Sequence, residues 1–261
     1  MHLYLRVLGS LIKRNVMDRA DSILVLAGGD FDKECMLDAK LTNVTISNID
    51  DYNAPGDYAP YQWRPIDAER IDAEDGSYDW VVIHDGLHHL AVPALSVCEM
   101  FRVARKGILC FEARDSILMK LSIKFGLASD YELEPAFLSD GVSGGYRNGP
   151  VPNYVYRWTE REFEKTINSF APTHRHVFFY DYGFRFPAKR FAMARSALYR
   201  LSGLLIAKLI PIAEILFRTQ GNSFAFGVLK TEATLQPWLA PDLKFKREYM
   251  AKAYDKQKYQ R

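Results

Sequence analysis

Four short apolar segments, separated by helical or polar stretches, most constrain the fold of this chain. They read SILVLAG from Ser22, NVTISNID from Asn43, YDWVVIHDG from Tyr78 and KGILCFEA from Lys106. Runs such as ILVL, WVVI and ILCF are typical of strands that are buried on both faces. The intervening segments KECMLDAKL and VPALSVCEMFRVAR can form helices. We therefore predict an α/β fold, a doubly wound and mostly parallel sheet covered by helices.

The rest of the chain is predicted to complete this sheet and to carry one insertion. Thr159 is followed three residues later by Glu162, a capping box, so a helix should begin there. The segments HRHVFFYDYGF and SFAFGVLK alternate as strands do, and a helical insertion separates them. The predicted boundaries are an N-terminal helix at 1–20, a core at 21–186 and 222–230, the insertion at 187–221 and a tail at 231–261.

Composition excludes several classes of protein. The chain has 261 residues, 48% apolar and 25% charged, which suits one large domain with a sizeable core. Its formal charge of +2 gives no reason to expect a nucleic-acid partner. Cys35, Cys98 and Cys110 lie far apart without paired spacing, which argues against a disulfide scaffold and a zinc site. We expect no metal and a reduced, cytoplasmic setting.

The first apolar segment ends in a turn, AGGDFD from Ala27, that limits the ligand. A nicotinamide-binding turn needs spaced glycines so that backbone amides can meet a pyrophosphate. Asp30 and Asp32 would repel that group, whereas S-adenosylmethionine has no phosphate and carries a sulfonium and an amino group. Asp50, about 20 residues further on, is placed to bind the ribose hydroxyls of either cofactor. The alternative for Asp50 is a strand-end residue that caps a turn.

A later block of sequence resembles a known family. The segment PIDAERIDAEDGSYDWVVIHDGLHHL contains Asp67-Ala68, then DGSYD, an apolar strand and LHHL, and EMFRVARKGILCFEARDS follows it. Over residues 22–116 these ordered blocks resemble the class I S-adenosylmethionine-dependent methyltransferases, in particular the small-molecule, type 11-like group. The resemblance implies a seven-stranded, Rossmann-like methyltransferase fold and S-adenosylmethionine as cofactor.

The resemblance also implies which residues bind the cofactor, from the methionine moiety to the adenine. They are Ala27, Gly28 and Gly29 for the methionine, Asp50 for the ribose, Asp67 and Ala68 for the adenine, and His84 and Asp85 at a strand exit. Two positions depart from the family pattern: Val25 replaces a usual acidic residue and Phe31 replaces the third glycine. We expect Asp30 or Asp32 to substitute at the amino-acid end of the cofactor.

The histidine pair of LHHL supplies candidates for catalysis. Methyl transfer depends mainly on alignment, with a base needed when the acceptor is a weak nucleophile. Either His88 or His89 can serve as that base, because an imidazole titrates near neutral pH. The alternative is that His88 packs beside the adenine pocket or caps the following helix.

The acceptor is predicted to contact the stretch RNGPVPNYVYRWTERE. Arginine and aromatic side chains together suit a sugar ring or an anionic phosphate. The acceptor-binding candidates are Arg147, Asn153, Tyr156 and Arg157. The alternative is that Tyr156 belongs to the core and that Arg157 is a surface charge.

The insertion is both basic and apolar. Residues 187–218 contain six Lys or Arg, and the segment LSGLLIAKLIPIAEILF is interrupted by Lys208, Pro211 and Glu214. A bilayer span needs about 20 continuous apolar residues, so spanning is not expected. Residues 187–218 can instead make peripheral contact with the inner membrane face. The alternative is a helical pair that packs on the sheet edge or on another subunit of a homo-oligomer.

These observations predict an S-adenosylmethionine-dependent methyltransferase that O-methylates a saccharide or glycan precursor. Membrane contact would favour a lipid-linked glycan as the small-molecule acceptor. One alternative is a non-catalytic methyltransferase-fold scaffold in a glycan-assembly complex, favoured by Val25 and Phe31 in the turn. A nicotinamide-dependent oxidoreductase is the other, and the aspartates of the turn disfavour it.

Overall fold

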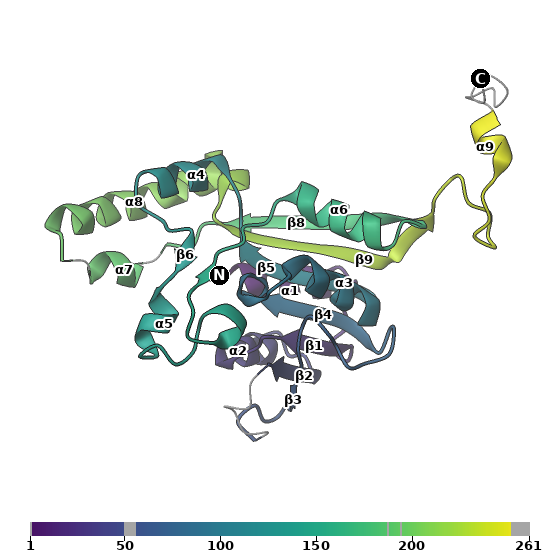
Figure 1. Ribbon diagram of the computed structural model, residues 1–261, viewed down its shortest axis with the longest axis horizontal. Helices are drawn as coiled ribbons and strands as arrows, with labels where there is room; N and C mark the ends of the chain where they lie inside the picture. Colours follow the sequence, from purple (N-terminus) through teal and green to yellow (C-terminus); the bar gives the residue numbers. More distant parts are fainter. Residues whose placement is uncertain (1, 50–55, 187, 194, 252–261) are drawn as a thin grey trace.

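The computed structural model describes residues 2–49, 56–186, 188–193 and 195–251. Its centre is a seven-stranded sheet with the order β3-β2-β1-β4-β5-β9-β8 (Figure 1). The strands are β1 (Ser22–Leu26), β2 (Asn43–Asn48), β3 (Gln62–Pro65), β4 (Tyr78–His84), β5 (Ala104–Ala113), β8 (His174–Gly183) and β9 (Ser223–Leu235). Only β9 is antiparallel to its neighbours in this sheet of described residues. The predicted doubly wound, seven-stranded fold is confirmed.

Helices cover both faces of the sheet, as the doubly apolar strands require. Along β4, Trp80 and Val82 belong to one hydrophobic cluster, and Val81 and Ile83 belong to the other. All four side chains are fully buried. The covering helices are α1 (Leu3–Lys13) and α2 (Asp30–Asp38) on the first face, and α3 (Pro93–Val103) and α6 (Glu160–Phe170) on the second.

Several predicted boundaries can be compared with the structure. Helix α6 begins after Thr159, whose hydroxyl accepts from the Glu162 N–H while the Glu162 carboxylate accepts from the Thr159 N–H, so the capping box is confirmed. Helix α1 ends at Lys13, short of residue 20, and β9 continues to Leu235, past residue 230. The edge strand β3 was not predicted from the sequence.

The segments between β5 and α6 lie beyond the carboxyl ends of the parallel strands (Figure 1). They include α4 (Ile117–Lys124), α5 (Glu134–Leu138) and the strand pair β6 (Tyr131–Glu132) and β7 (Asn153–Tyr154). A short 3-10 helix, η2 (Tyr146–Asn148), lies between α5 and β7. Chain order reverses between β1 and β4, so these segments cover the edge where ligands bind in doubly wound sheets.

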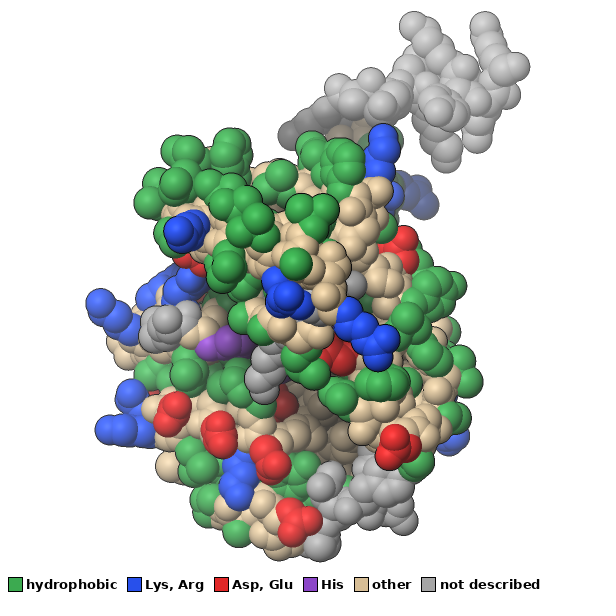
Figure 2. All heavy atoms as spheres, turned by 90° about the vertical axis from the view of Figure 1, so that its left-hand side faces the viewer, with side chains coloured by type: hydrophobic (Ala, Val, Ile, Leu, Met, Phe, Trp, Pro, Cys, Tyr) green, Lys and Arg blue, Asp and Glu red, His purple; other side chains and the backbone are tan. Residues whose placement is uncertain are grey.

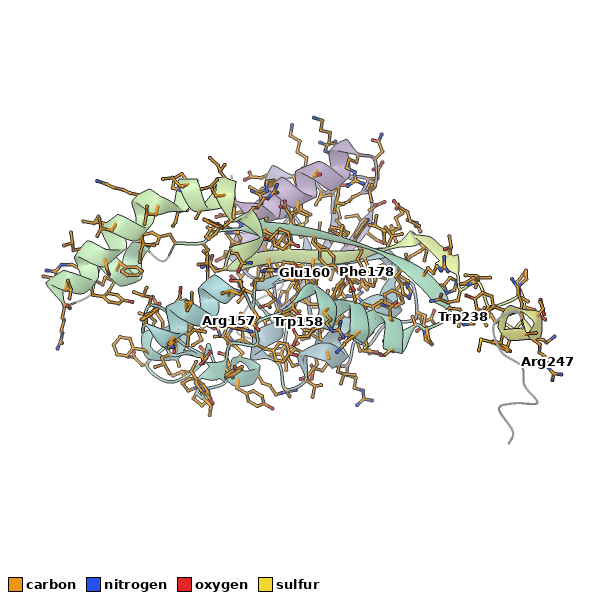
Figure 3. The ribbon with its side chains drawn as sticks, turned by 90° about the horizontal axis from the view of Figure 1, so that it is seen from above. Arg157, Trp158, Glu160, Phe178, Trp238 and Arg247 are labelled. Carbon is orange, nitrogen blue, oxygen red and sulfur yellow. The ribbon has the colours of Figure 1, made fainter. Side chains whose placement is uncertain are left out.

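The predicted insertion forms α7 (Ala188–Ala192), α8 (Ala197–Leu216) and a 3-10 helix, η3 (Arg218–Gln220). Helix α8 extends from one end of the molecule, and α9 (Arg247–Ala251) projects from the other (Figure 1). Figure 3 shows the same separation from above, with Trp238 and Arg247 beyond the far end of the sheet. Among the described helices, none combines the length and the apolar character that a bilayer crossing requires.

Candidate active site

The turn after β1 is held by close packing and by a helix cap. Ala27 has a φ of 49°, in the left-handed region that a glycine adopts more easily. A Cβ on Gly28 would lie 2.7 Å from Cγ2 of Ile46, so glycine lets the turn pass under β2. The Gly29 N–H donates to Oδ2 of Asp32 at 3.0 Å and caps the start of α2. These contacts aim the start of α2 at the edge where chain order reverses.

The two acids of this turn differ in exposure: Asp30 is exposed to solvent, whereas Asp32 packs inside the protein. Asp32 is buried, and its Oδ1 lies 4.0 Å from Nδ1 of His84. Burial raises the pKa of Asp32. Neither Asp30 nor Asp32 lines those cavities. The expectation that one of them binds the amino-acid end of the cofactor therefore gains no support from this geometry.

A cavity of about 250 Å3, here called the smaller cavity, lies beyond the carboxyl ends of β1, β2 and β4. Its lining includes Ala27, Asn48, Ala68, Asp85, Gly86 and Leu90. Ala27, Ala68 and Asp85 are thus brought together as predicted, whereas Gly28 and Gly29 support the turn without lining this cavity. Asp50, the predicted ribose ligand, lies outside the described residues, two positions after the lining residue Asn48.

The predicted adenine-binding carboxylate, Asp67, is paired with an arginine at the same cavity. Arg147 donates to Oδ2 of Asp67 and to Oε2 of Glu69, each at 2.7 Å. The other oxygen of Asp67 accepts from the Glu69 N–H at 2.9 Å. Arg147 itself lines the smaller cavity together with Asn148 and Gly144. The sequence placed Arg147 with the acceptor, but the structure places it with the predicted cofactor residues.

A larger cavity of about 970 Å3 lies on the other side of Asp85, which lines both. Part of its wall is charged or polar, and part is apolar. The polar part includes Glu112, Glu132, Arg157, Arg185 and Asn222. The apolar part includes Met119, Leu133, Phe137, Leu138, Val155 and Met193. The two cavities therefore meet at the carboxyl end of β4, where a cofactor and an acceptor can approach one another.

The two residues at the exit of β4 differ in what they contact. Asp85 has a φ of 48° and pairs with the Arg185 guanidinium. Burial raises the pKa of Asp85. His84 and Arg185 lower it by more than burial raises it, so the net pKa lies below the ordinary value. His84 packs among aromatic rings, with its ring centroid 5.1 Å from that of Tyr4 and 5.0 Å from that of Phe31. It lines neither cavity. Asp85 is thus the better placed of the two predicted residues to face a ligand.

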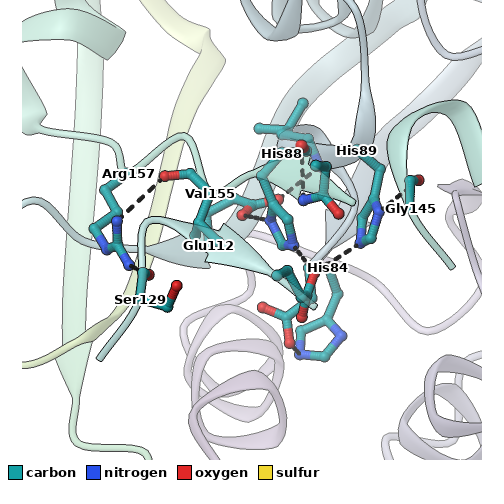
Figure 4. A network of polar contacts seen from close by, with 12 residues as sticks. His84, His88, His89, Glu112, Ser129, Gly145, Val155 and Arg157 are labelled. Carbon is teal, nitrogen blue, oxygen red and sulfur yellow. Dashed lines mark hydrogen bonds and ion pairs between the residues drawn. The ribbon is translucent and has the colours of Figure 1, made fainter. Parts of the chain in front are cut away.

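The histidine pair belongs to η1 (Leu87–His89) and joins a network of carboxylates (Figure 4). His88 Nδ1 lies 2.5 Å from Oε2 of Glu112, and His88 Nε2 lies 3.2 Å from Oε2 of Glu132. His89 Nδ1 lies 3.1 Å from the Gly145 carbonyl, and His89 Nε2 lies 3.4 Å from the same Glu132 oxygen. Both rings therefore direct Nε2 toward a single carboxylate.

The two imidazoles differ in their protonation. Burial lowers the pKa of His88, but the Glu112 carboxylate and then Glu132 raise it more, so the net pKa lies well above the ordinary value. Burial and the neighbouring His88 lower the pKa of His89. The Gly145 carbonyl can only accept, so Nδ1 of His89 carries the proton and Nε2 presents a lone pair. In this arrangement His88 is not free to take a proton.

The other predicted acceptor residues are dispersed. Asn153 is buried and donates to the His88 carbonyl at 3.2 Å, and Tyr156 donates to Glu162 at 3.3 Å. Arg157 lines the larger cavity and bonds to Asp130 and to the Ser129 carbonyl; the contact with Ser129 is drawn in Figure 4. Of the four candidates only Arg157 lines that cavity, and an acceptor role for any of them stays a prediction.

Sequence reasoning missed three residues of the larger cavity. Glu112 ends the apolar run ILCF, so the strand-end rule that selected Asp85 would have found it. Glu132 stands in an irregular segment that carries no periodic signal. Arg185 follows β8 and reaches Asp85 from a position 100 residues away, which only the fold reveals.

Comparisons with known proteins agree with the fold. Residues 29–111 match a family model described as a methyltransferase domain. The fold is similar to that of an S-adenosylmethionine-dependent methyltransferase from Archaeoglobus fulgidus, at 13% identity and a TM-score of 0.50, over 87% of this chain and 94% of that one. It is also similar to YcgJ from Bacillus subtilis, at 12% identity and a TM-score of 0.50, over 86% and 98% of the two chains. No curated protein matches the sequence.

Proposed function

We propose that this chain is a class I S-adenosylmethionine-dependent methyltransferase and that it methylates a hydroxyl of a saccharide or glycan precursor. The match of residues 29–111 to a methyltransferase domain and the similarity of the fold support the first part of the proposal. The observation that carries the proposal is the larger cavity, which meets the smaller one at Asp85. Sugar hydroxyls need hydrogen-bond acceptors, and the partly exposed carboxylate of Glu132 lines the larger cavity. The carboxylate of Glu112 is fully buried and bonded to His88 and to the Leu87 N–H, so it orients His88 rather than a sugar. The side of the same cavity formed by α4 and α5 is mainly apolar.

The smaller cavity has features that suit the cofactor. Small residues, Ala27, Ala68 and Gly86, leave room beyond the strand ends, and a Cβ on Gly86 would lie 2.7 Å from that of Ala27. Asp67 would hold the adenine amino group, and Asp85 would face the cationic end of the cofactor. Bound S-adenosylmethionine supplies a methyl group that its sulfonium activates for transfer.

The residues at the junction of the cavities would handle the acceptor proton. As the acceptor oxygen forms its bond to the methyl carbon, the carbon–sulfur bond breaks and the hydroxyl proton must leave. Of the two predicted bases, His89 has the free lone pair, and Glu132 stands 3.4 Å from it to stabilise the resulting imidazolium. His88, held between Glu112 and Glu132, would position Glu132 rather than accept the proton.

The surface of the insertion supports an acceptor with a lipid anchor. Only Gly203 is buried along α8, and Leu198, Leu204 and Ile215 are 77%, 65% and 82% exposed. Hydrophobic side chains gather on the upper part of this end of the molecule (Figure 2). Residues 187–218 also carry six Lys or Arg, which suits an anionic lipid surface. We therefore propose that the protein contacts the inner membrane face and that its acceptor is a lipid-linked glycan.

A transfer assay tests the proposed reaction. The full chain is incubated with methyl-labelled cofactor and lipid-linked or soluble glycan precursors, and mass spectrometry looks for a gain of one methyl group on a sugar hydroxyl. Asp67→Asn should weaken binding of S-adenosylhomocysteine in calorimetry, whereas the exposed Arg161→Gln on α6 should not. Methylation of lipids or proteins alone would refute the saccharide acceptor.

Membrane contact has a separate test. The full chain should sediment with vesicles of phosphatidylglycerol and phosphatidylcholine and stay in solution with phosphatidylcholine alone. Ile215→Glu, at a highly exposed position, should reduce sedimentation without changing the melting temperature. Equal sedimentation of the variant would assign the apolar face of α8 to a protein partner instead.

A further inference from the structure

The geometry points to a divalent transition-metal site formed by His88, His89 and Glu132. Among the described residues, these three form the group whose ligand atoms lie close enough to share an ion, all within 4.8 Å of one another. Their side chains come from η1 and from β6, two elements that the fold brings together over the carboxyl end of β4. Ion binding itself does not depend on the proposed reaction.

Two of the three separations between the ligand atoms match those of a metal centre, and the third lies within 4.8 Å. Oε2 of Glu132 lies 3.2 Å from Nε2 of His88 and 3.4 Å from Nε2 of His89. In a tetrahedral zinc site with bonds of about 2.0–2.1 Å, neighbouring ligand atoms are about 3.3 Å apart. Two edges of the ligand triangle therefore already have the required length.

Both imidazoles are also oriented as metal ligands are. A ligating histidine usually donates its other N–H to a carboxylate or a backbone carbonyl, which fixes the ring and its tautomer. Glu112 takes this place for His88 at 2.5 Å, and the Gly145 carbonyl takes it for His89 at 3.1 Å. The lone pair of His89 then faces a carboxylate oxygen. A cation placed between these two acceptors would satisfy both, and a divalent ion can fill this place.

The position of the cluster gives the ion an open coordination place. His89 lines the smaller cavity, whereas Glu132 and Glu112 line the larger one. Three protein ligands with one free position are typical of catalytic rather than structural zinc sites. Two imidazoles and one carboxylate favour zinc, iron(II) or cobalt over magnesium or calcium. If the proposed function holds, His89 would act as base only in the metal-free chain. In the metal-bound chain the acceptor hydroxyl would bind at the free position, where the ion favours loss of its proton to solvent.

Metal-stripped, tag-free full chain is titrated with Zn²⁺ in a calorimeter, and with Co²⁺ while the visible spectrum is recorded. We expect one ion per chain and the absorption bands of tetrahedral cobalt. His89→Gln and Glu132→Gln should each lower the affinity by at least about 100-fold. Glu112→Gln removes the carboxylate that orients and charges His88 without removing a ligand, and should lower the affinity by about 10- to 100-fold. His174→Gln on β8 is the matched control and should bind as the wild type does.

Absence of zinc uptake by the folded wild type would overturn the inference. Unchanged affinity in both His89→Gln and Glu132→Gln would overturn it as well, and circular dichroism establishes that each variant is folded. The proposed function is judged separately by binding of S-adenosylhomocysteine. A chain that binds this ligand but no zinc keeps the proposed function and refutes the metal site, and the reverse result keeps the metal site.

Discussion

The contact between Arg147 and Asp67 should oppose cofactor binding, and Arg147→Gln tests this. Both oxygens of Asp67 are engaged, one by the Glu69 N–H and the other by Arg147 at 2.7 Å. If Asp67 is to accept from the adenine amino group, the exposed contact with Arg147 must open first. Arg147→Gln removes that competitor and leaves the contact with the Glu69 N–H unchanged.

The size of the effect follows from exposure. The side chains of Arg147 and Asp67 are 38% and 31% exposed, so solvent screens their attraction. Such pairs contribute about 0.2–1 kcal/mol, and the second contact of Arg147, to Glu69, places this one near the upper end. Since about 1.4 kcal/mol changes an equilibrium constant tenfold, a competitor worth about 1 kcal/mol corresponds to about fivefold tighter binding of S-adenosylhomocysteine.

Calorimetry at low ionic strength measures this change, and the difference should shrink in high salt, because screening weakens the competing pair. Arg161→Gln removes the same charge from α6 and serves as the control. In an Asp67→Asn background, Arg147→Gln should have no further effect. Unchanged or weaker binding by Arg147→Gln alone would refute the reasoning, because Arg147 would then assist the cofactor.

Two further predictions concern stability. Gly28→Ala should lower the unfolding free energy by about 1–3 kcal/mol, because the new Cβ would overlap Ile46. Gly29→Ala is the control: nothing lies within 4 Å of its Cβ, so the unfolding free energy should change by less than about 0.5 kcal/mol. Equal urea midpoints for the two variants would contradict this. Burial raises the pKa of Asp79, but Arg105 and Ser22 lower it more, so the net pKa is depressed. A carboxyl group whose pKa is lower in the folded state stabilises the fold at pH values above its pKa in the unfolded chain. It loses that contribution as the pH falls through its pKa in the folded state. The stability advantage of wild type over Asp79→Asn should therefore be constant above about pH 5 and should shrink as the pH falls from there to below about 3.9, the unfolded pKa. A constant difference over that range would refute the link.

The fold could be predicted because strands that are buried on both faces of the sheet appear in the sequence as continuous runs of apolar residues. Each of β1, β4 and β5 carries a run of apolar residues, and such runs cannot lie at a surface. The edge strand β3 reads QWRP and is largely exposed, so nothing in its sequence distinguishes it from a loop. Likewise, β9 extends past residue 230 through exposed residues, where no hydrophobic pattern fixes its end.

Site residues at strand ends could be predicted for the same reason. Once the strands are placed, Ala27 and Asp85 must lie at one edge of the sheet, and both line the smaller cavity. Arg147 could not be placed this way, because the Gly-rich segment around it has neither periodicity nor a strand to fix its direction. Its proximity in sequence to Tyr156 and Arg157 grouped it with them, whereas in the fold it lines the smaller cavity.

The histidine pair shows why a role cannot be assigned from adjacent residues alone. In sequence His88 and His89 look equivalent. Yet the carboxylate that raises the pKa of His88 comes from β5, 24 residues away, and the carboxylate that both rings face comes from β6, 44 residues from His88. An imidazole acts as base, as cation or as ligand according to the group that its other nitrogen contacts. Glu112 makes His88 a cation in the absence of metal, and the Gly145 carbonyl leaves His89 with a lone pair. The chemistry of this site is therefore decided by contacts that the tertiary structure creates. The metal titration distinguishes the two roles that these contacts allow for the histidines, metal ligand or acid–base group.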